Sequence, residues 1–140
     1  MKKLILVLIV ILISTNTLHA ANFKWTRIVT TIDGTTEFYI DKKSVKKVGK
    51  FHYYWMMSNY LKLEEGNDPN VKSTITSNIL NCETSEFKSV TLTSFNSNKG
   101  RGEIEIDVII PDEDISYFAW DYFDEKTSFG AVFKVVCKTK

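Results

Sequence analysis

Residues 102–110 read GEIEIDVII, the most regular alternation of apolar and acidic side chains in the chain. Apolar residues stand at every second position, at Ile104, Ile106, Val108 and Ile110, and acidic residues stand at the alternate positions 103, 105 and 107. Successive side chains of a β-strand point to opposite faces, so the pattern predicts a strand with one buried and one solvated face. Strands of this kind are typical of antiparallel sheets.

Strand composition continues upstream, where β-branched and aromatic residues are concentrated in separate segments. These segments are 25–32, 35–40, 51–63, 72–82 and 87–96. Asp33-Gly34 predicts a hairpin turn between the first two segments, and the composition of 64–70 predicts a loop. Together with 102–110, these segments predict an antiparallel sheet of about six strands.

The segment 51–63 has most of its large apolar residues on one parity. They are Phe51, Tyr53, Trp55, Met57 and Leu61. This parity is therefore expected to face the core. His52 falls on the other parity with Tyr54, which is expected to be the wetter face.

Two segments predict helices. Asp41 can cap a short helix over 42–48 that ends at Gly49. From 128 to 137, apolar residues at i, i+3, i+4 and i+7 form the stripe of an amphipathic helix. The expected fold class is therefore α+β, with a C-terminal helix packed on a single antiparallel sheet.

The first twenty residues have the layout of a bacterial secretory signal. Lys2 and Lys3 precede ten consecutive Leu, Ile and Val residues at 4–13, and Ala20 is the best cleavage position. We therefore expect 1–20 to be a signal peptide and 21–140 to be the mature domain. No later segment is apolar for the length of a membrane span. The mature protein is thus expected to be exported to the periplasm, the outer surface or the medium.

The charge of the mature chain is close to neutral. The sequence has 18 basic and 17 acidic residues, and two of the basic ones leave with the signal peptide. This balance argues against a protein that binds nucleic acid or a membrane through its whole surface.

Cys82 and Cys137 are the two cysteines. In an oxidising compartment we expect them to form a disulfide. Two free thiols or a redox pair are the alternatives, although the cysteines of redox pairs usually stand two residues apart. A bond closing this long loop would stabilise the domain by about 4 kcal/mol.

No catalytic, metal or cofactor constellation is visible. His19 leaves with the signal peptide, so His52 is the one histidine that could activate a nucleophile. The acidic run at 112–114 lacks the alternating ligands and central glycine of a calcium loop. Gly100 and Gly102 are too closely spaced for a phosphate cradle. We therefore expect a protein that is not an enzyme and has no cofactor.

Five lysines are concentrated in 42–50. They are Lys42, Lys43, Lys46, Lys47 and Lys50. On a helix they would cover one arc with Val45 and Val48 opposite, so the plain interpretation is a solvated helix face. The functional interpretation is an anion-binding face for sulfated glycans, lipopolysaccharide phosphates or an acidic patch on a host protein.

An aromatic cluster precedes the C-terminal helix. It comprises Tyr117, Phe118, Trp120, Tyr122 and Phe123. Most of it is expected to lie in the core between helix and sheet. The alternative is an exposed docking patch that includes Tyr117, Phe118 and Trp120.

Several short motifs occur in order between Trp25 and Cys137. They are Tyr39-Ile40-Asp41, Ser44-Val45, Gly49, Tyr54-Trp55, Tyr60, Lys72-Ser73, Asn81-Cys82, Gly100-x-Gly102 and Ser128. In this order they resemble the surface-adhesin protein E-like family of Gram-negative bacterial envelope proteins. Asn81 departs from the family pattern, which usually has Asp before the first cysteine.

The resemblance implies an antiparallel sheet with a C-terminal helix held by a disulfide, and a location in the envelope or at the surface. It also implies adhesion to host matrix and plasma proteins, with a link to haem. No motif assigns these activities to numbered residues of this chain.

Two function classes remain open from the sequence. The first is an exported, non-enzymatic binding module, such as an adhesin that engages a host glycoprotein or polyanion. The second is a periplasmic accessory protein that binds a bacterial envelope partner. A protein or a polyanionic glycan is the expected partner in the first class, and nucleic acid is expected in neither.

Overall fold

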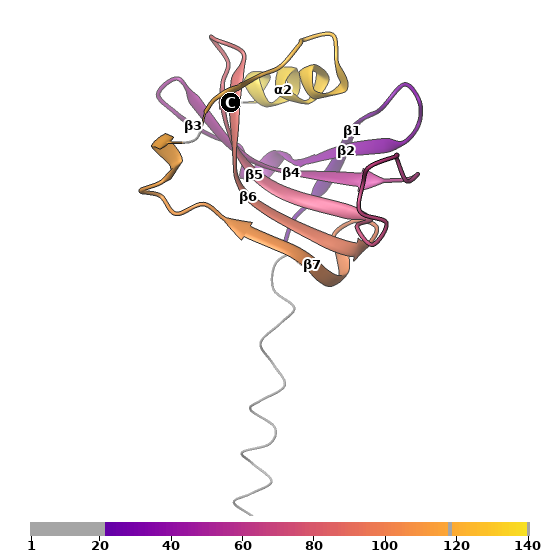
Figure 1. Cartoon of the computed structure of the whole chain (residues 1–140). Coiled ribbons are helices and arrows are strands. Elements are labelled where there is room, and N and C mark those ends of the chain that lie inside the picture. Colours follow the sequence, from indigo (N-terminus) through magenta and orange to yellow (C-terminus); the bar gives the residue numbers. More distant parts are fainter. Residues whose placement is uncertain (1–21, 118, 140) are drawn as a thin grey trace, which may run out of the picture.

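An antiparallel sheet forms the framework of the protein, and one α-helix packs on it (Figure 1). The computed structural model describes residues 22–117 and 119–139. The main path across the sheet is β1 (Trp25–Thr30), β2 (Thr36–Asp41), β4 (Phe51–Tyr60), β5 (Ser73–Asn81), β6 (Glu86–Ser97) and β7 (Arg101–Ile109). Two short strands complete the eight-stranded sheet: β3 (Lys46–Val48) pairs with β4, and β8 (Asp121–Tyr122) pairs with β6. The predicted fold class is confirmed.

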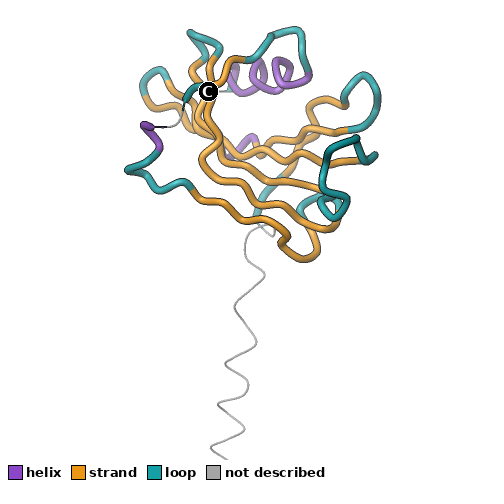
Figure 2. Tube along the Cα trace, in the orientation of Figure 1, coloured by secondary structure: helices purple, strands orange, loops and turns teal. Residues whose placement is uncertain are grey.

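Strands dominate the described chain (Figure 2). The helical elements are two 3₁₀ turns, η2 (Lys42–Ser44) and η3 (Ile115–Tyr117), and the C-terminal helix α2 (Ser128–Lys138). The predicted signal peptide, 1–20, lies outside the described residues.

The two faces of the sheet differ because α2 packs on one of them. We call that face the helix face and the opposite one the far face. On the helix face, α2 packs against β1, β2 and β4, and Val132, Phe133 and Val136 are fully buried there. Tyr54 and Met56 belong to the same cluster. A second cluster, of Met57, Ile75 and Phe95, lies on alternate positions of the same strands and therefore on the far face.

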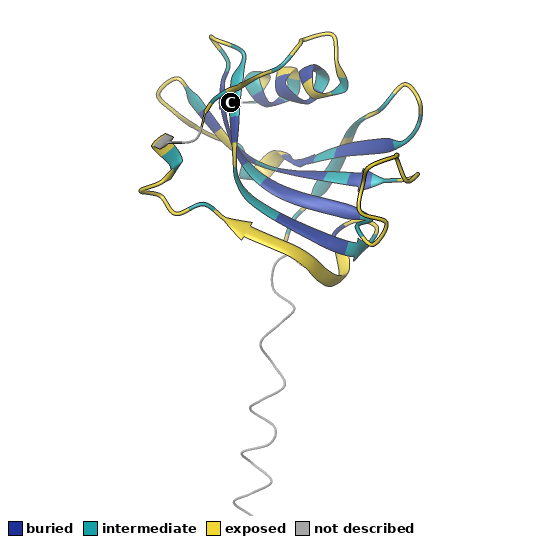
Figure 3. Cartoon of the chain, viewed as in Figure 1, coloured by how far each residue is buried: buried dark blue, intermediate teal, exposed yellow. Residues whose placement is uncertain are grey.

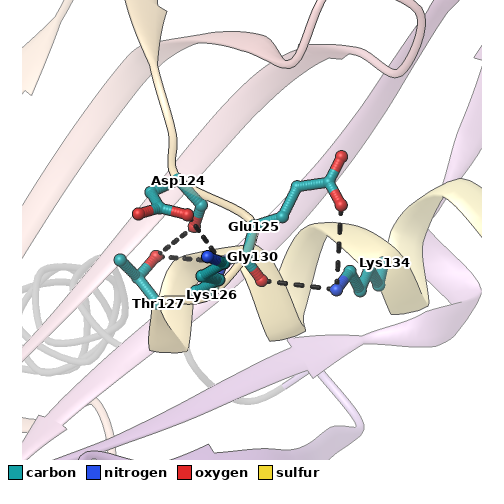
Figure 4. Close-up of polar contacts among 6 residues, drawn as sticks. All are labelled: Asp124, Glu125, Lys126, Thr127, Gly130 and Lys134. Atoms are coloured by element: carbon teal, nitrogen blue, oxygen red, sulfur yellow. Dashed lines mark hydrogen bonds and ion pairs between the residues drawn. The ribbon is translucent and has the colours of Figure 1, made fainter.

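The start of α2 is fixed by its cap (Figure 4). The Thr127 hydroxyl accepts a hydrogen bond from the Gly130 N–H at 3.2 Å and donates one to the Asp124 carbonyl at 2.6 Å. Near the other end, Cys137 is bonded to Cys82, which follows β5, as predicted. The disulfide thus ties the end of the helix to the sheet, and the cap fixes its start to the preceding loop.

The prediction that His52 and Tyr54 lie on the wetter face of 51–63 is wrong, whereas Met57, on the other parity, is buried as expected. His52 is only 4% exposed and Tyr54 only 2%, because their parity is the one that faces α2. Tyr53, on the parity expected to be buried, is 39% exposed. Both parities of β4 carry aromatic residues, so the alternation alone could not identify the face that the distant helix covers.

The predicted burial of one face of 102–110 is also wrong. The segment forms β7, but β7 is the edge of the sheet and all nine of its residues are exposed (Figure 3). A β-bulge further breaks the alternation, since Ile106 pairs with Ser94 while Ile104 pairs with Phe95, the next residue of β6. Ile104 and Ile106 therefore lie on opposite faces.

The helix predicted over 42–48 does not form. Asp41 caps a single 3₁₀ turn, and its carboxylate accepts from the Lys43 N–H at 3.1 Å. After this turn the chain becomes β3, which pairs with the start of β4 through a turn at Gly49 in the left-handed region. Pairing with β4 satisfies the backbone groups that a free-standing helix would have had to satisfy within itself.

A lysine-bearing cavity on the far face

The two lysines of β3 lie on opposite faces of the sheet. Lys46 pairs with Tyr53 on the far face, and Lys47 pairs with His52 on the helix face. The five lysines of 42–50 are all exposed, but they do not form the single arc that a helix would have given. The structure therefore separates lysines that the sequence analysis had grouped.

Lys43 and Lys46 meet at a far-face cavity of about 570 Å³. Aromatic side chains from two parts of the chain share its lining, namely Phe23 before β1 and Tyr53 and Trp55 on β4. The hydroxyl-bearing residues Ser44 and Ser77 and the carboxyl-bearing residues Asp41 and Asp112 also line it. The cavity thus combines aromatic surface, hydroxyl groups, two ammonium groups and two carboxyl groups.

The turn that carries Lys43 is tied to β4 by hydrogen bonds. The Ser44 hydroxyl donates to the Asp41 carbonyl at 2.6 Å and accepts from the Trp55 N–H at 3.0 Å. Together with the Asp41 cap, these bonds fix the 3₁₀ turn beside the cavity. The position of Lys43 is consequently set by the backbone around it.

The aromatic wall rests on a packed base. The Phe23 ring lies 4.8 Å from the Trp25 ring and 5.1 Å from the Trp55 ring, centroid to centroid. All three rings pack against the far-face cluster around Met57. The wall is therefore held by packing, and the ring of Trp55 can act as a fixed surface.

The lysines of the segment have no acidic partner within the part of the chain that the structure describes. Its two ion pairs join Arg27 to Glu37 and Lys134 to Glu125. Of the two carboxylates at the cavity, that of Asp41 is already engaged in capping the 3₁₀ turn. Neither Lys43 nor Lys46 is ion-paired within the described residues, and Asp112 is the other carboxylate that shares the cavity with them.

The remaining lysines have other surroundings. Lys47 faces the helix side, where burial and the Lys47 charge lower the pKa of His52. The Nζ of Lys50 lies 5.3 Å from the centroid of the Phe51 ring. Neither lysine lines the far-face cavity.

Comparison with known proteins identifies the family. The family model described as surface-adhesin protein E matches residues 25–138. The chain belongs to the surface-adhesin protein E family. The predicted resemblance is confirmed, and membership favours a surface adhesin over the periplasmic accessory alternative. It also indicates an exported or surface-located, non-enzymatic protein that binds host partners.

Solved structures of protein E share the fold of this family member. One structure of Haemophilus influenzae protein E is 14% identical, covers 88% of each chain and has a TM-score of 0.51. Crystal form II of the same protein is 14% identical, covers 88% of this chain and 96% of its own, and has a TM-score of 0.52. No curated protein sequence matches the chain.

The aromatic cluster of this adhesin-family protein is divided rather than gathered into one patch. The Trp120 ring stacks on Phe51 at 5.5 Å, and the Lys88 Nζ lies 4.7 Å from its centroid. Phe123 packs in the core, 4.2 Å from the Phe133 ring. Phe118 and the side chain of Tyr117 lie outside the described residues. A docking role for Tyr117, Phe118 and Trp120 stays a prediction.

Other kinds of site find little support in residues 22–117 and 119–139. Histidine, cysteine and acidic side chains do not gather there in groups of three or more that could hold a metal ion. None of the helices in those ranges has the length and apolarity to cross a membrane. His52 is buried with its Nδ1 3.3 Å from the Cys82 sulfur, so it faces the disulfide rather than solvent.

The aromatic half of the cavity was not predicted from the sequence. Phe23 lies outside every predicted strand, and Tyr53 and Trp55 were assigned to the core. The available signal was the aromatic content of both parities of 51–57, which shows that neither face of β4 is simply solvated. The sequence draws attention to the lysines, but only the fold of the η2 turn and β3 shows that Lys43 and Lys46 line the same cavity.

Proposed function

We propose that this surface-adhesin family member binds sulfated glycans of a host surface through Lys43 and Lys46 at the far-face cavity. One observation carries the proposal, namely two lysines without acidic partners beside an aromatic-lined cavity of about 570 Å³. The volume lies in the range that binds small ligands or the end unit of a larger one.

The chemistry of the cavity matches the two parts of a sulfated sugar. A sulfate group carries a fixed negative charge, and an ammonium group attracts it through hydrogen bonds assisted by charge. A sugar ring has an apolar face that can lie on Trp55 or Tyr53, while its hydroxyls can bond to Ser44 and Ser77. Both elements are needed, because exposed lysines alone contribute little per contact.

The direct test compares two double variants with equal charge change. Lys43→Gln/Lys46→Gln alters the lysines that line the cavity, and Lys47→Gln/Lys50→Gln alters their neighbours that do not. We expect the first variant to elute from heparin at clearly lower salt than the parent, and the second to elute close to the parent. Both variants should keep the parent's unfolding temperature, because all four side chains are exposed.

Chemically desulfated heparin provides the ligand control. The proposal requires that desulfation abolish retention of the parent and remove the difference between the two double variants. Equal losses from both variants would indicate a diffuse charge effect and would contradict a role for the cavity. Full retention of the Lys43→Gln/Lys46→Gln variant would exclude the site.

A further inference from the structure

The outer side of strand β7 is an unpaired edge of the sheet. It ends the strand order, and all nine of its residues are exposed (Figure 1, Figure 3). Its pairing with β6 is regular from Ile106 to Ile109, beyond the bulge. A strand in this position carries backbone donors and acceptors on its outer side that can pair with another extended chain.

A cavity of about 470 Å³ adjoins this border on the helix face. Ile106 of β7 and Leu92 of β6 line it, and Leu61 and Leu63 from the loop after β4 line it as well. Three of these four residues are strongly exposed, namely Leu61, Leu63 and Ile106. These side chains form the apolar part of the lining, and Lys62, Asp68 and Lys72 belong to its polar part.

The base of the same cavity is polar and already satisfied. The hydroxyls of Thr74 and Ser94 lie 3.0 Å apart in a hydrogen bond, and the Tyr60 hydroxyl donates to Thr74 at 3.4 Å. Thr74 and Ser94 are both buried. The cavity therefore suits a side chain with an apolar stem that enters between Leu61, Leu63 and Ile106.

The far-face side of β7 carries one carboxylate, Asp107, between Ile104 and Ile109, and the strand as a whole is acidic. Asp107 lies on the far face, because its carboxylate accepts from the Thr93 hydroxyl at 2.8 Å. Glu103 and Glu105 are further carboxylates of the strand, against one basic residue, Arg101. Pairing with a second β7 would bring like charges together, which disfavours self-association. Pairing with a basic strand would bring opposite charges together.

We propose that β7 binds an extended segment of another polypeptide in which apolar and basic residues alternate. The segment adds a strand beside Ile106–Ile109 through main-chain hydrogen bonds. Its apolar side chains lie on the helix face, where one enters the cavity beside Ile106. A basic side chain lies on the far face beside Asp107, near the carboxylate of Glu105 at the bulge. This surface is separate from the lysine-bearing cavity and does not depend on the glycan proposal.

The test uses a blocked octapeptide, TKVKVKVT, with a fluorescent label, and measures its anisotropy against the mature protein. The variant Glu105→Lys/Asp107→Asn reverses one charge and removes another, and the amide introduced by Asp107→Asn retains an acceptor for the Thr93 hydroxyl. We expect it to weaken binding about tenfold or more, since two attractive contacts are lost and one repulsive contact is added. The matched control is Glu113→Lys/Asp112→Asn, which makes the same charge change just after β7 and should leave binding unchanged.

Two further peptides separate strand pairing from charge attraction. A peptide N-methylated at alternate residues keeps its charge but loses one row of amide donors, and it should bind at least about tenfold more weakly. A peptide of the same composition with its lysines grouped at one end should also lose binding.

Equal binding of all three peptides would overturn the proposal, as would absence of binding by the alternating peptide. A parent protein that dimerises through β7, with a dimer broken by Glu105→Lys, would also contradict it. Lys43→Gln/Lys46→Gln should bind the alternating peptide like the parent. That result keeps a failure here distinct from a failure of the glycan proposal.

Discussion

At the scale of single residues, the most constrained polar group is Glu37 on the far face. Its carboxylate accepts from the Tyr39 hydroxyl at 2.8 Å, from Asn59 Nδ2 at 3.0 Å and from Arg27 Nη1 at 2.9 Å. Glu37 itself is buried. The Tyr39 hydrogen bond, followed by the Arg27 and Asn59 contacts, lowers the pKa of Glu37 below its ordinary value of 4.5 despite the opposing effect of burial.

Because the carboxyl pKa of Glu37 is lower in the folded protein, the stability of the fold depends on pH. The stability contributed by Glu37 is present above the pKa of the unfolded chain and is lost as pH falls through the lower pKa of the folded state. We predict that Glu37→Gln lowers the free energy of unfolding by about 1 kcal/mol at pH 7, through weaker hydrogen bonds. The deficit should shrink as pH falls below about 4.5. Urea unfolding of both proteins at a series of pH values measures this, and a constant deficit would contradict it.

For Tyr54 we expect that removing the polar group does not destabilise the protein, unlike the removal of the Glu37 charge. Its ring is buried against Phe133, and within the described residues its hydroxyl has no hydrogen-bond partner. Burial raises the pKa of Tyr54 well above its ordinary value. We predict that Tyr54→Phe is neutral or stabilises the fold by about 1 kcal/mol, because it removes an unpaired polar group from the core. A clear loss of stability on thermal unfolding would mean that the hydroxyl has a partner.

The residue types that matter could be found from the sequence, but their surroundings could not. The two cysteines were correctly predicted to pair, and a binding role for the lysines of 42–50 stays a prediction. His52 was assigned to the solvent-exposed face. Its parity in β4 does not reveal that α2, which comes much later in the chain, covers that face. Burial on a two-sided sheet is decided by such distant elements.

At the scale of elements, the docking of α2 depends on Gly130. A Cβ at this position would lie about 2.5 Å from the backbone of Glu125, which a side chain cannot displace easily. We predict that Gly130→Ala destabilises the protein by about 1–3 kcal/mol, by forcing the cap loop and the helix apart. Lys134→Ala, on the exposed side of the same helix, should change stability by less than about 0.5 kcal/mol. Chemical unfolding compares them, and equal stability of the two variants would show that the loop can yield.

Elements with a strong local signal were predicted nearly to their ends. The apolar stripe of 128–137 matches α2, and the turn residues of 33–34 and 64–70 separate the strands as expected. The helix predicted over 42–48 failed because the pairing of β3 with β4 is a tertiary contact. The prediction that one face of 102–110 is buried was wrong for a related reason. Alternation predicts a strand but not its place at the centre or the edge of a sheet.

At the scale of the whole molecule, the disulfide joins the C-terminal helix to the centre of the sheet. It links Cys82, just after β5, to Cys137 in α2, across 55 residues of chain. We predict that Cys82→Ala/Cys137→Ala lowers the free energy of unfolding by about 2–5 kcal/mol, mainly because the unfolded chain gains freedom. Reduction of the parent should have a comparable effect. Calorimetry measures both, and an unchanged unfolding temperature would contradict the prediction.

The whole molecule also separates its two proposed surfaces. The lysine-bearing cavity lies on the far face near β3 and β4, and the peptide-binding border lies along β7 at the edge of the sheet. Each can be altered without touching the other, because the residues involved are exposed and belong to different strands. An adhesin with two such surfaces could hold a glycan and a polypeptide segment at the same time.

An ¹⁵N-resolved NMR titration of residues 21–140 with a sulfated heparin hexasaccharide tests whether the glycan binds at the lysine-bearing cavity. The lysine-bearing cavity predicts saturable shifts at the Lys43, Lys46 and Tyr53 amides and at the Trp55 indole. Amides of β7 should remain in place, and the desulfated hexasaccharide should produce no shifts. Shifts confined to other basic residues, or equal shifts with the desulfated sugar, would contradict the assignment of glycan binding to this cavity.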